Sequence, residues 1–220
     1  ALPMLDSIIF DMDGLLFDTE IVYYEASQMV ADQMGFPYDK ELYLKYLGVS
    51  DEEVWANYHQ IFASFGKNNV QKFINDAYEE TIRRFSLGAV QLKPGVIELL
   101  DFLEEHRIPK VVASSNQRHI IELLLEKNQL TNYFETIVSA ENVKRAKPDP
   151  EIFLLAHEYL GTKKQETLVL EDSKNGILAA ASAEIPVIMI PDLLAPSEDL
   201  QQKTLAVLSS LHEVPGYLKK

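Results

Sequence analysis

Cysteine is absent from the 220 residues of this chain, tryptophan occurs once, and basic residues are outnumbered. Without cysteine the chain can form no disulfide, no thiolate metal site and no cysteine nucleophile. Twenty basic residues against thirty-four acidic ones give a net charge of −14, which argues against nucleic acid or an anionic membrane as the main partner. An anionic substrate must therefore be attracted by local positive groups.

Long apolar runs are also missing. No stretch approaches the ~18 apolar residues of a membrane-spanning helix, and residues 1–6 show no basic segment followed by an apolar one. We therefore expect neither a membrane helix nor a secretory signal, and the lack of cysteine fits a cytoplasmic protein. The length suits one large domain, or a core domain that carries an insertion.

The most informative stretch is residues 8–14, IIFDMDG. Its three apolar residues predict a strand buried on both faces, as at the centre of a parallel sheet. Asp11 and Asp13 follow at the strand's end, where open α/β sheets bind ligands, and Gly14 permits a tight turn. Two carboxylates this close repel each other unless a cation lies between them or one takes a proton. Taken alone, the stretch is equally compatible with an acidic turn.

The rest of the chain divides into two parts with different sequence patterns. Residues 19–85 contain many helix formers and few β-branched runs, which predicts a bundle of about four helices. Beyond Gly88 strands and helices alternate, as in a parallel sheet. Further strands are expected at residues 110–113, 136–138, 167–170 and 186–190, and a last strand and a terminal helix within 205–217.

Polar residues follow three of these later strands, at the same edge of the sheet as Asp11. Ser114, Ser115 and Asn116 offer a hydroxyl and backbone N–H groups for an anion, although Asn116 also suits a simple helix cap. Lys147 precedes a proline, which stiffens the chain that presents its ammonium group.

The last of these sites is a second acidic pair, Glu171 and Asp172, again directly after an apolar strand. If this pair lies next to Asp11 and Asp13, the four residues form an oxygen-rich site. Such a site suits Mg²⁺, a hard cation that takes carboxylates, waters and phosphate oxygens as ligands.

The order of these sites resembles the four signature motifs of the haloacid dehalogenase (HAD) superfamily, in its β-phosphoglucomutase-like branch. Residues 10–20 (FDMDGLLFDTE), 147–150 (KPDP) and 170–180 (LEDSKNGILAA) carry the resemblance, which covers essentially the whole chain. It implies an α/β fold, with a Rossmann-like parallel-sheet core over residues 1–17 and 88–220. An all-helical cap domain would be inserted at residues 18–87.

The resemblance also implies catalytic roles. Asp11 corresponds to the nucleophile that becomes an aspartyl phosphate, and Asp13 to the general acid/base. Ser114 corresponds to the hydroxyl that binds the transferring phosphoryl group, and Lys147 to the cation that neutralises it. The implied phosphate-binding set is Ser114, Ser115, Asn116 and Lys147.

A magnesium ion is the cofactor that the resemblance implies. Its protein ligands would be the Asp11 side chain, the backbone carbonyl of Asp13 and the carboxylate of Asp172, with Glu171 in a supporting role. Phosphoryl transfer needs mainly alignment and charge neutralisation, which such a site supplies.

Departures from the family pattern bear on the substrate. β-Phosphoglucomutases carry an arginine directly after Gly-Val-Ser in the cap, where it grips a second phosphate, and this chain has Asp51 there. Tyr23 replaces the hinge histidine of many relatives. We therefore favour a monomeric, Mg²⁺-dependent phosphatase of a small phosphorylated metabolite, such as a sugar phosphate, over a phosphosugar mutase. The substrate would be chosen by cap residues Tyr23, Ser50, Asp51 and Trp55.

Two alternatives come from other classes. A phosphoacceptor (receiver) domain also uses a phosphorylated Asp, a Ser or Thr and a Lys-Pro on a parallel α/β fold. Receiver domains are shorter, and they lack both a helical insertion and an acid two residues after the acceptor. A binding-only member of the fold would lack one of the key residues, and none is missing here.

Overall fold

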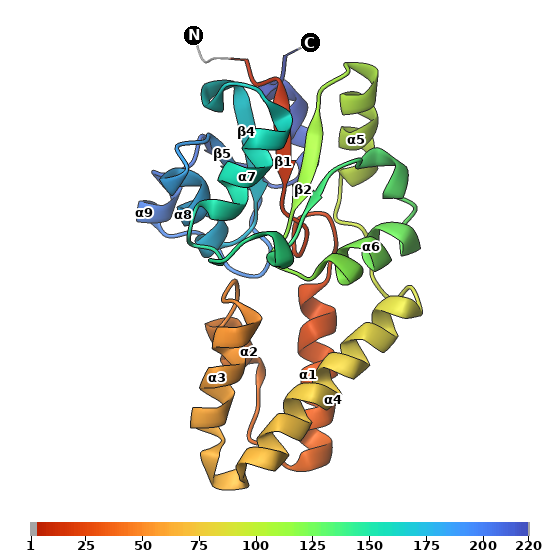
Figure 1. Cartoon of the computed structure of the whole chain (residues 1–220), viewed down its shortest axis with the longest axis vertical. Coiled ribbons are helices and arrows are strands. Elements are labelled where there is room, and N and C mark those ends of the chain that lie inside the picture. Colours follow the sequence, from red (N-terminus) through yellow and green to blue (C-terminus); the bar gives the residue numbers. More distant parts are fainter. Residues whose placement is uncertain (1–3, 220) are drawn as a thin grey trace.

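The structure is a computed structural model, and it describes residues 4–219. Residues 1–3 and 220 of the expected core domain lie outside the described part. Six parallel strands form one sheet in the order β3-β2-β1-β4-β5-β6 (Figure 1). The strands are β1 Ser7–Phe10, β2 Lys110–Ala113, β3 Ile137–Val138, β4 Thr167–Glu171, β5 Val187–Met189 and β6 Ala206–Val207. This order reverses at β1, and ligands bind at such a reversal in doubly wound folds.

Helices cover both faces of the sheet because successive strand side chains point to opposite sides. Ile8 and Phe10 of β1 pack in one apolar cluster, while Ile9 between them packs in another. The first cluster includes residues of α5 Val96–Glu105, α6 Arg118–Lys127 and the 3₁₀ helix η5 Leu211–Tyr217. The second includes residues of α7 Glu151–Leu160, α8 Lys174–Ser182 and α9 Glu198–Gln201. The predicted α/β core with a parallel sheet is confirmed.

Short 3₁₀ turns complete the core. They are η2 Thr131–Tyr133, η3 Ala140–Asn142 and η4 Lys164–Glu166. Two details of the tail differ from the prediction. Its terminal helix is a 3₁₀ helix, with Pro215 inside it, and the short helix α9 was not expected.

The insert between β1 and β2 is helical, as predicted. Its elements are α1 Glu20–Met34, α2 Lys40–Lys45, α3 Asp51–Ile61, the 3₁₀ helix η1 Ala63–Phe65 and α4 Lys67–Ser86. The side chains of Asp39 and Ser50 cap α2 and α3, and Gly35 ends α1 with a left-handed φ of 74°. The insert has its own apolar core, in which Phe36, Phe62 and Phe73 are in mutual contact.

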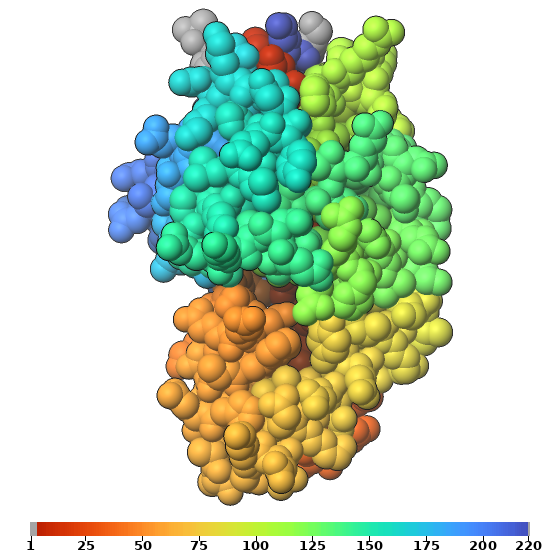
Figure 2. Space-filling model, viewed as in Figure 1, coloured from red at the N-terminus to blue at the C-terminus, as the bar shows by residue number. Residues whose placement is uncertain are grey.

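Two chain segments join the insert to the core, and they are hydrogen-bonded to each other. The N–H of Asp18 donates to the carbonyl of Gln91 and that of Lys93 to the carbonyl of Leu16, both at 2.8 Å. A third link lies across the domain gap, where Asn175 Nδ2 donates to the Gly48 carbonyl at 2.9 Å. Figure 2 shows the insert seated against the core, with a hollow where the two meet. Within residues 4–219, no helix combines the length and the apolar character that crossing a membrane requires.

Candidate active site

The pairing of β1 with β4 brings the first and last acidic motifs together. Phe10 is paired with Leu170, and the N–H of Asp11 donates to the Leu170 carbonyl at 3.1 Å. Asp11 therefore leaves the sheet beside Glu171 and Asp172. These three carboxylates are buried, and one oxygen of each lies within 4.8 Å of the others. The two acidic motifs thus meet at the edge where the strand order reverses.

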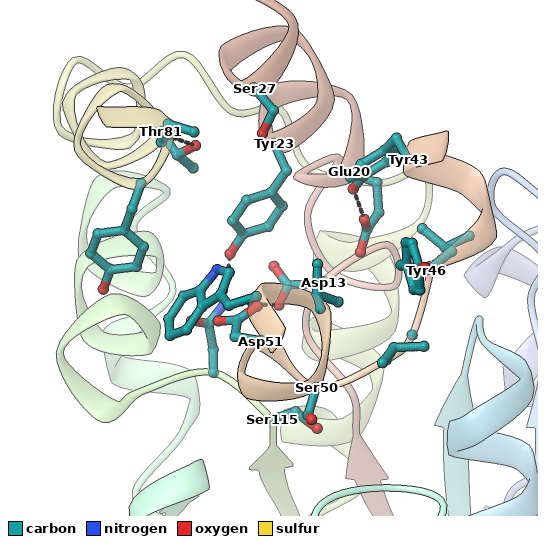
Figure 3. Close-up of a pocket in the computed structure, with 18 of the residues that line it drawn as sticks. Asp13, Glu20, Tyr23, Ser27, Tyr43, Tyr46, Ser50, Asp51, Thr81 and Ser115 are labelled. Carbon is teal, nitrogen blue, oxygen red and sulfur yellow. Dashed lines mark hydrogen bonds between the residues drawn. The ribbon is translucent and has the colours of Figure 1, made fainter. Parts of the chain in front are cut away.

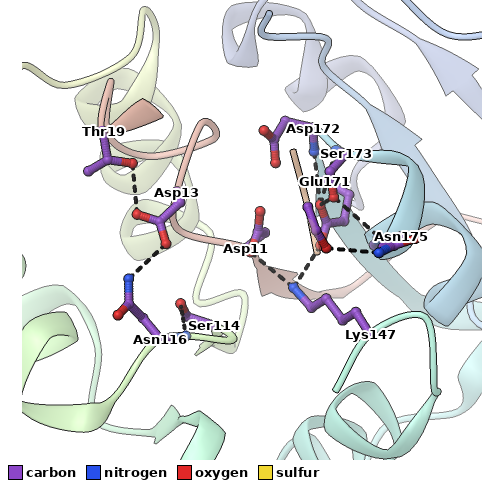
Figure 4. Close-up of polar contacts among 12 residues, drawn as sticks. Asp11, Asp13, Thr19, Ser114, Asn116, Lys147, Glu171, Asp172, Ser173 and Asn175 are labelled. Atoms are coloured by element: carbon purple, nitrogen blue, oxygen red, sulfur yellow. Dashed lines mark hydrogen bonds and ion pairs between the residues drawn. The ribbon is translucent and has the colours of Figure 1, made fainter. Parts of the chain in front are cut away.

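One ammonium group lies inside this acidic cluster. Lys147 Nζ is 3.0 Å from Asp11 Oδ1 and 2.7 Å from Glu171 Oε2 (Figure 4). Its other neighbour is the Phe153 ring, 4.8 Å from Nζ to the ring centroid. Burial alone would lower the pKa of Lys147, but the charges of Asp11 and Glu171 together raise that pKa above its usual value. Lys147 is therefore a permanent buried cation.

Three carboxylates around one ammonium leave the cluster with excess negative charge. Burial, and next the charge of Asp11, raises the pKa of Asp172 well above its usual value and that of Glu171 to about 7. Such a cluster is costly at low dielectric unless a further cation joins it. Carboxylate oxygens are the ligands that Mg²⁺ prefers. The donor set Asp11, Glu171 and Asp172 therefore fits a hard divalent cation.

The carboxylate of Glu171 is held from two sides. While Oε2 accepts from Lys147, Oε1 accepts from the backbone N–H of Asp172 at 3.0 Å and of Ser173 at 3.3 Å. Gly176 in the first turns of α8 leaves the room for this carboxylate, because a Cβ added there would lie 1.9 Å from the Glu171 Cδ. No role for Gly176 was expected from the sequence, although a glycine inside a helical pattern often has a packing reason.

Asp13 lies in a different environment from Asp11. Its Oδ1 accepts from Thr19 Oγ1 at 2.7 Å and its Oδ2 from Asn116 Nδ2 at 3.0 Å, so both partners are neutral. Burial raises the pKa of Asp13 to about 6, with a further contribution from the charge of Asp11. Two carboxylates in unlike surroundings can take unlike roles in proton transfer. Asp11 lies beside a permanent cation, whereas Asp13 is able to hold a proton near neutral pH.

The loop after β2 contributes the polar residues of the third motif. Ser114 is buried, and its Oγ accepts from the backbone N–H of Asn116 at 3.1 Å. Ser115 is exposed and lines the hollow below the cap. Asn116 does not cap the next helix, the alternative role that its residue type allowed, since α6 begins after Gln117, which makes no side-chain cap. The Asn116 amide instead donates to Asp13 and, at 2.7 Å, to the Tyr23 hydroxyl.

This geometry can be set beside that of known proteins. The haloacid dehalogenase-like hydrolase family matches residues 8–190, from β1 to the end of β5. The chain belongs to this family. Its predicted membership is confirmed, and the receiver-domain alternative loses its basis because the helical insert is present.

Two relatives and one solved structure, all from bacteria, are similar to this chain. A phosphorylated carbohydrates phosphatase of Thermotoga maritima is 38% identical over 182 residues, which cover 82% of each chain. The beta-phosphoglucomutase of Bacillus subtilis is 26% identical over 218 residues, or 95% of each chain. A solved structure from Thermotoga maritima is 34% identical, with a TM-score of 0.78, and covers 96% of this chain and 97% of that one. These neighbours agree with the predicted β-phosphoglucomutase-like branch.

In this HAD-like hydrolase a partly open cavity of about 200 Å³ lies between the helical insert and the strand ends (Figure 3). Asp11, Asp13 and Lys147 lie on its core side. All four cap residues that the sequence analysis named line it from the other side, namely Tyr23, Ser50, Asp51 and Trp55. The cavity therefore connects the reacting groups with the residues expected to choose the substrate.

Glu20 is a lining residue for which the sequence analysis assigned no role. It accepts a hydrogen bond from the Tyr43 hydroxyl inside the cavity. Burial, followed by the charge of Asp13, raises the pKa of Glu20 to about 8. Glu20 was within the motif that carried the family resemblance, but its contact with Tyr43 depends on how α1 and α2 pack. That packing could not be derived from local pattern.

Proposed function

We propose that this chain is a Mg²⁺-dependent phosphatase that hydrolyses a small phosphate monoester, such as a sugar phosphate, through an aspartyl phosphate on Asp11. The observation that carries the proposal is the contrast between two acids at the end of β1. Asp11 contacts the Lys147 ammonium at 3.0 Å, while Asp13 is held by neutral donors in surroundings that favour a proton. A nucleophile and a general acid are thus presented to one cavity.

In the first step, a carboxylate oxygen of Asp11 attacks the phosphorus in line with the leaving oxygen. The bond between phosphorus and the leaving oxygen breaks, and Asp13 gives its proton to that oxygen, so an alcohol is released. In the second step Asp13 takes a proton from water. The water oxygen bonds to phosphorus, the bond from phosphorus to Asp11 breaks, and inorganic phosphate leaves. Lys147 and Ser114 would bind the phosphoryl oxygens in both steps.

The metal in this proposal would be held by the side chains of Asp11 and Asp172 and the backbone carbonyl of Asp13, with Glu171 in support. When bound, Mg²⁺ neutralises phosphoryl charge and orients its oxygens. Support comes from the excess of carboxylates over ammonium groups in the cluster and from its all-oxygen donor set. Lys147 donates to both Asp11 and Glu171, which holds these two carboxylates near each other.

We also propose that residues 18–87 act as a cap domain that closes over the site. The connections would bend near residues 17–19 and 86–88, and Gly88 has a left-handed φ of 74° that suits a turn there. Closure would exclude bulk water from the aspartyl phosphate until the alcohol has left. The contact of Asn175 with Gly48 supports a closed arrangement.

A phosphosugar mutase is the second candidate, because the Bacillus subtilis relative bears that name. A mutase must hold a bisphosphate intermediate, which requires positive charge for the second phosphate. Lys147 is the sole lysine or arginine among the described residues that line the cavity, and Asp11 and Glu171 already neutralise it. This charge balance supports the phosphatase.

Phosphorus NMR separates the two activities. The enzyme with Mg²⁺ is given hexose 1-phosphates and 6-phosphates with a trace of bisphosphate. A phosphatase accumulates inorganic phosphate, whereas a mutase converts the 1-phosphate into the 6-phosphate with little free phosphate. Asp11→Asn should lower phosphate release by at least about 1000-fold while circular dichroism stays unchanged. Appreciable turnover by a folded Asp11→Asn protein would remove Asp11 as the nucleophile.

A further inference from the structure

The cap side of the cavity is acidic and offers no cation to a ligand. Its acidic residues are Glu20, whose pKa of about 8 keeps it mainly protonated at neutral pH, and Asp51. The only ammonium on the described lining is that of Lys147 on the core side. Because Lys147 is already paired with Asp11 and Glu171, a second anionic group on the substrate would meet no positive charge. Such a group would be desolvated without compensation.

Asp51 is the residue that gives the cap side its charge. It is the first residue of α3, directly after the capping residue Ser50. Asp51 is exposed to solvent at the cavity wall, and no hydrogen bond or ion pair reaches its carboxylate from the part of the chain that the structure describes. The charge of Asp51 makes a minor contribution, far behind burial, to the raised pKa values of Asp13 and Tyr23, and all three residues line the same cavity (Figure 3). A leaving group protonated by Asp13 would therefore occupy the same cavity as the Asp51 carboxylate.

Two neighbours show that this placement is particular to Asp51. Glu52 and Glu53 also lie in the first turn of α3, where acidic residues are favoured by the helix dipole, but neither lines the cavity. The helix dipole thus explains an acidic first turn but not the direction of Asp51. Aromatic residues complete the wall around it, among them Tyr23, Trp55 and Tyr78. Their ring faces attract cations and pack against sugar rings.

We propose that the cavity selects a phosphate monoester whose leaving group carries a protonated amine among hydroxyl groups, that is, an amino sugar or amino polyol phosphate. Asp51 is the specificity-determining residue that accepts the amine and disfavours a second anion. This inference rests on the phosphatase activity proposed above. It adds an order of substrate preference. The value of kcat/KM should be highest for a cationic leaving group, lower for a neutral one and lowest for an anionic one.

The test compares two hexose phosphates that differ only at C2 with a third, open-chain compound that carries an added carboxylate at C1. Phosphate release is measured with glucosamine 6-phosphate, glucose 6-phosphate and 6-phosphogluconate. We expect kcat/KM to fall about tenfold from the amine to the hydroxyl, and further for the added carboxylate, because the charge of Asp51 acts inside a partly enclosed site. Asp51→Asn should bring the amine and hydroxyl compounds to within about twofold of each other. Glu53→Gln, which removes the same charge from the same helix turn outside the cavity, should keep the wild-type order.

A binding experiment separates failure of this inference from failure of the proposed function. Asp11→Asn protein with Mg²⁺ is titrated calorimetrically with the same amine and hydroxyl compounds, which it does not turn over. The inference requires tighter binding of the amine and loss of that preference in the Asp11→Asn, Asp51→Asn double variant. Equal binding of the two compounds overturns the inference even if the wild type releases phosphate. Preferential binding without any turnover by the wild type upholds the inference and contradicts the phosphatase.

Discussion

The side-chain amide of Asn116 lies 3.0 Å from Oδ2 of Asp13, and it connects the loop after β2 to the loop after β1. The same nitrogen donates to the Tyr23 hydroxyl on α1. The Asn116 side chain therefore links the loops after β1 and β2 to the helical insert. A donor to the carboxylate favours its ionised form and lowers the pKa of Asp13, against the effect of burial. Asn116, after the stronger effect of Thr19, therefore lowers the proton affinity of the proposed general acid/base.

Asn116→Ala should move the pH dependence of turnover. A hydrogen bond to a charged group contributes about 1.5–3 kcal/mol, so its loss should raise the pKa of Asp13 by about one unit above its value near 6. The ionised form of Asp13, which the second step needs, is then populated only at higher pH. The acidic limb of the profile of kcat against pH therefore shifts to higher pH. Tyr23→Phe, which keeps the contact between Asn116 and Asp13, should leave that limb in place. An unmoved limb in Asn116→Ala would show that Asn116 does not tune Asp13.

Gly176→Ala should disrupt the seat of Glu171. The added Cβ would lie 2.0 and 2.2 Å from the two carboxylate oxygens, so Glu171 must move and its contact with Lys147 is lost. We expect destabilisation of about 2–4 kcal/mol in urea unfolding, together with loss of activity. Gly216→Ala is the matched control, because a Cβ at Gly216 meets nothing within 4 Å. Equal stability of the two variants would contradict the close packing of Gly176.

Asp172→Asn should separate metal binding from folding. The amide keeps the size of the side chain but removes one of three crowded negative charges, so the metal-free protein should be no less stable than wild type. Its affinity for Mg²⁺ should fall at least about tenfold, as measured by calorimetry, because a carboxylate ligand is lost. Asp199→Asn, at an exposed position in α9, should bind Mg²⁺ like wild type. Unchanged affinity in Asp172→Asn would exclude Asp172 as a ligand.

The fold followed from local patterns where those patterns are strong. The strand before Asp11 and the strand at 110–113 were predicted from short apolar runs, since a strand buried on both faces needs no alternation. The four helices of the insert followed from helix formers between glycine turns. The meeting of Asp11 with Glu171 did not follow from either pattern. It depends on the pairing of β1 with β4, and only the family resemblance implied that Asp11 and Asp172 share a metal site.

The parts that could not be predicted are contacts between elements. Asn116 suits a helix cap by its residue type, and nothing local indicates that its amide points away from α6 toward Asp13. Glu20 and Tyr43 are 23 positions apart and lie on different helices, α1 and α2. Their hydrogen bond therefore depends on how those helices pack. Gly176 has its role because a carboxylate from β4 lies against α8.

Glu20 should make the stability of the protein depend on pH above neutrality. Its folded pKa of about 8 exceeds its ordinary value of 4.5, so the folded state binds the proton more tightly than the unfolded state. The stabilisation is complete below about pH 4.5 and is lost as the pH rises through 8. We expect a loss on the order of 2 kcal/mol between pH 6 and 9, measured by urea unfolding without metal.

Glu20→Gln isolates this contribution, because the amide resembles the protonated acid and can still accept from Tyr43. Between pH 7 and 9 the free energy of unfolding of the variant should fall less than that of wild type. The other buried acids still make this free energy depend on pH in both proteins. Glu25→Gln on the same helix removes an exposed carboxylate and should follow the wild-type curve. If the free energy of unfolding of Glu20→Gln falls as steeply as that of wild type above pH 7, Glu20 does not hold a proton. Glu20 and Asp51 on the cap side of the cavity are then both charged at neutral pH. With Glu20 and Asp51 both charged, the cavity would repel anionic leaving groups still more strongly. The pH at which Glu20 loses its proton therefore also predicts the pH above which the substrate preference attributed to Asp51 becomes stronger.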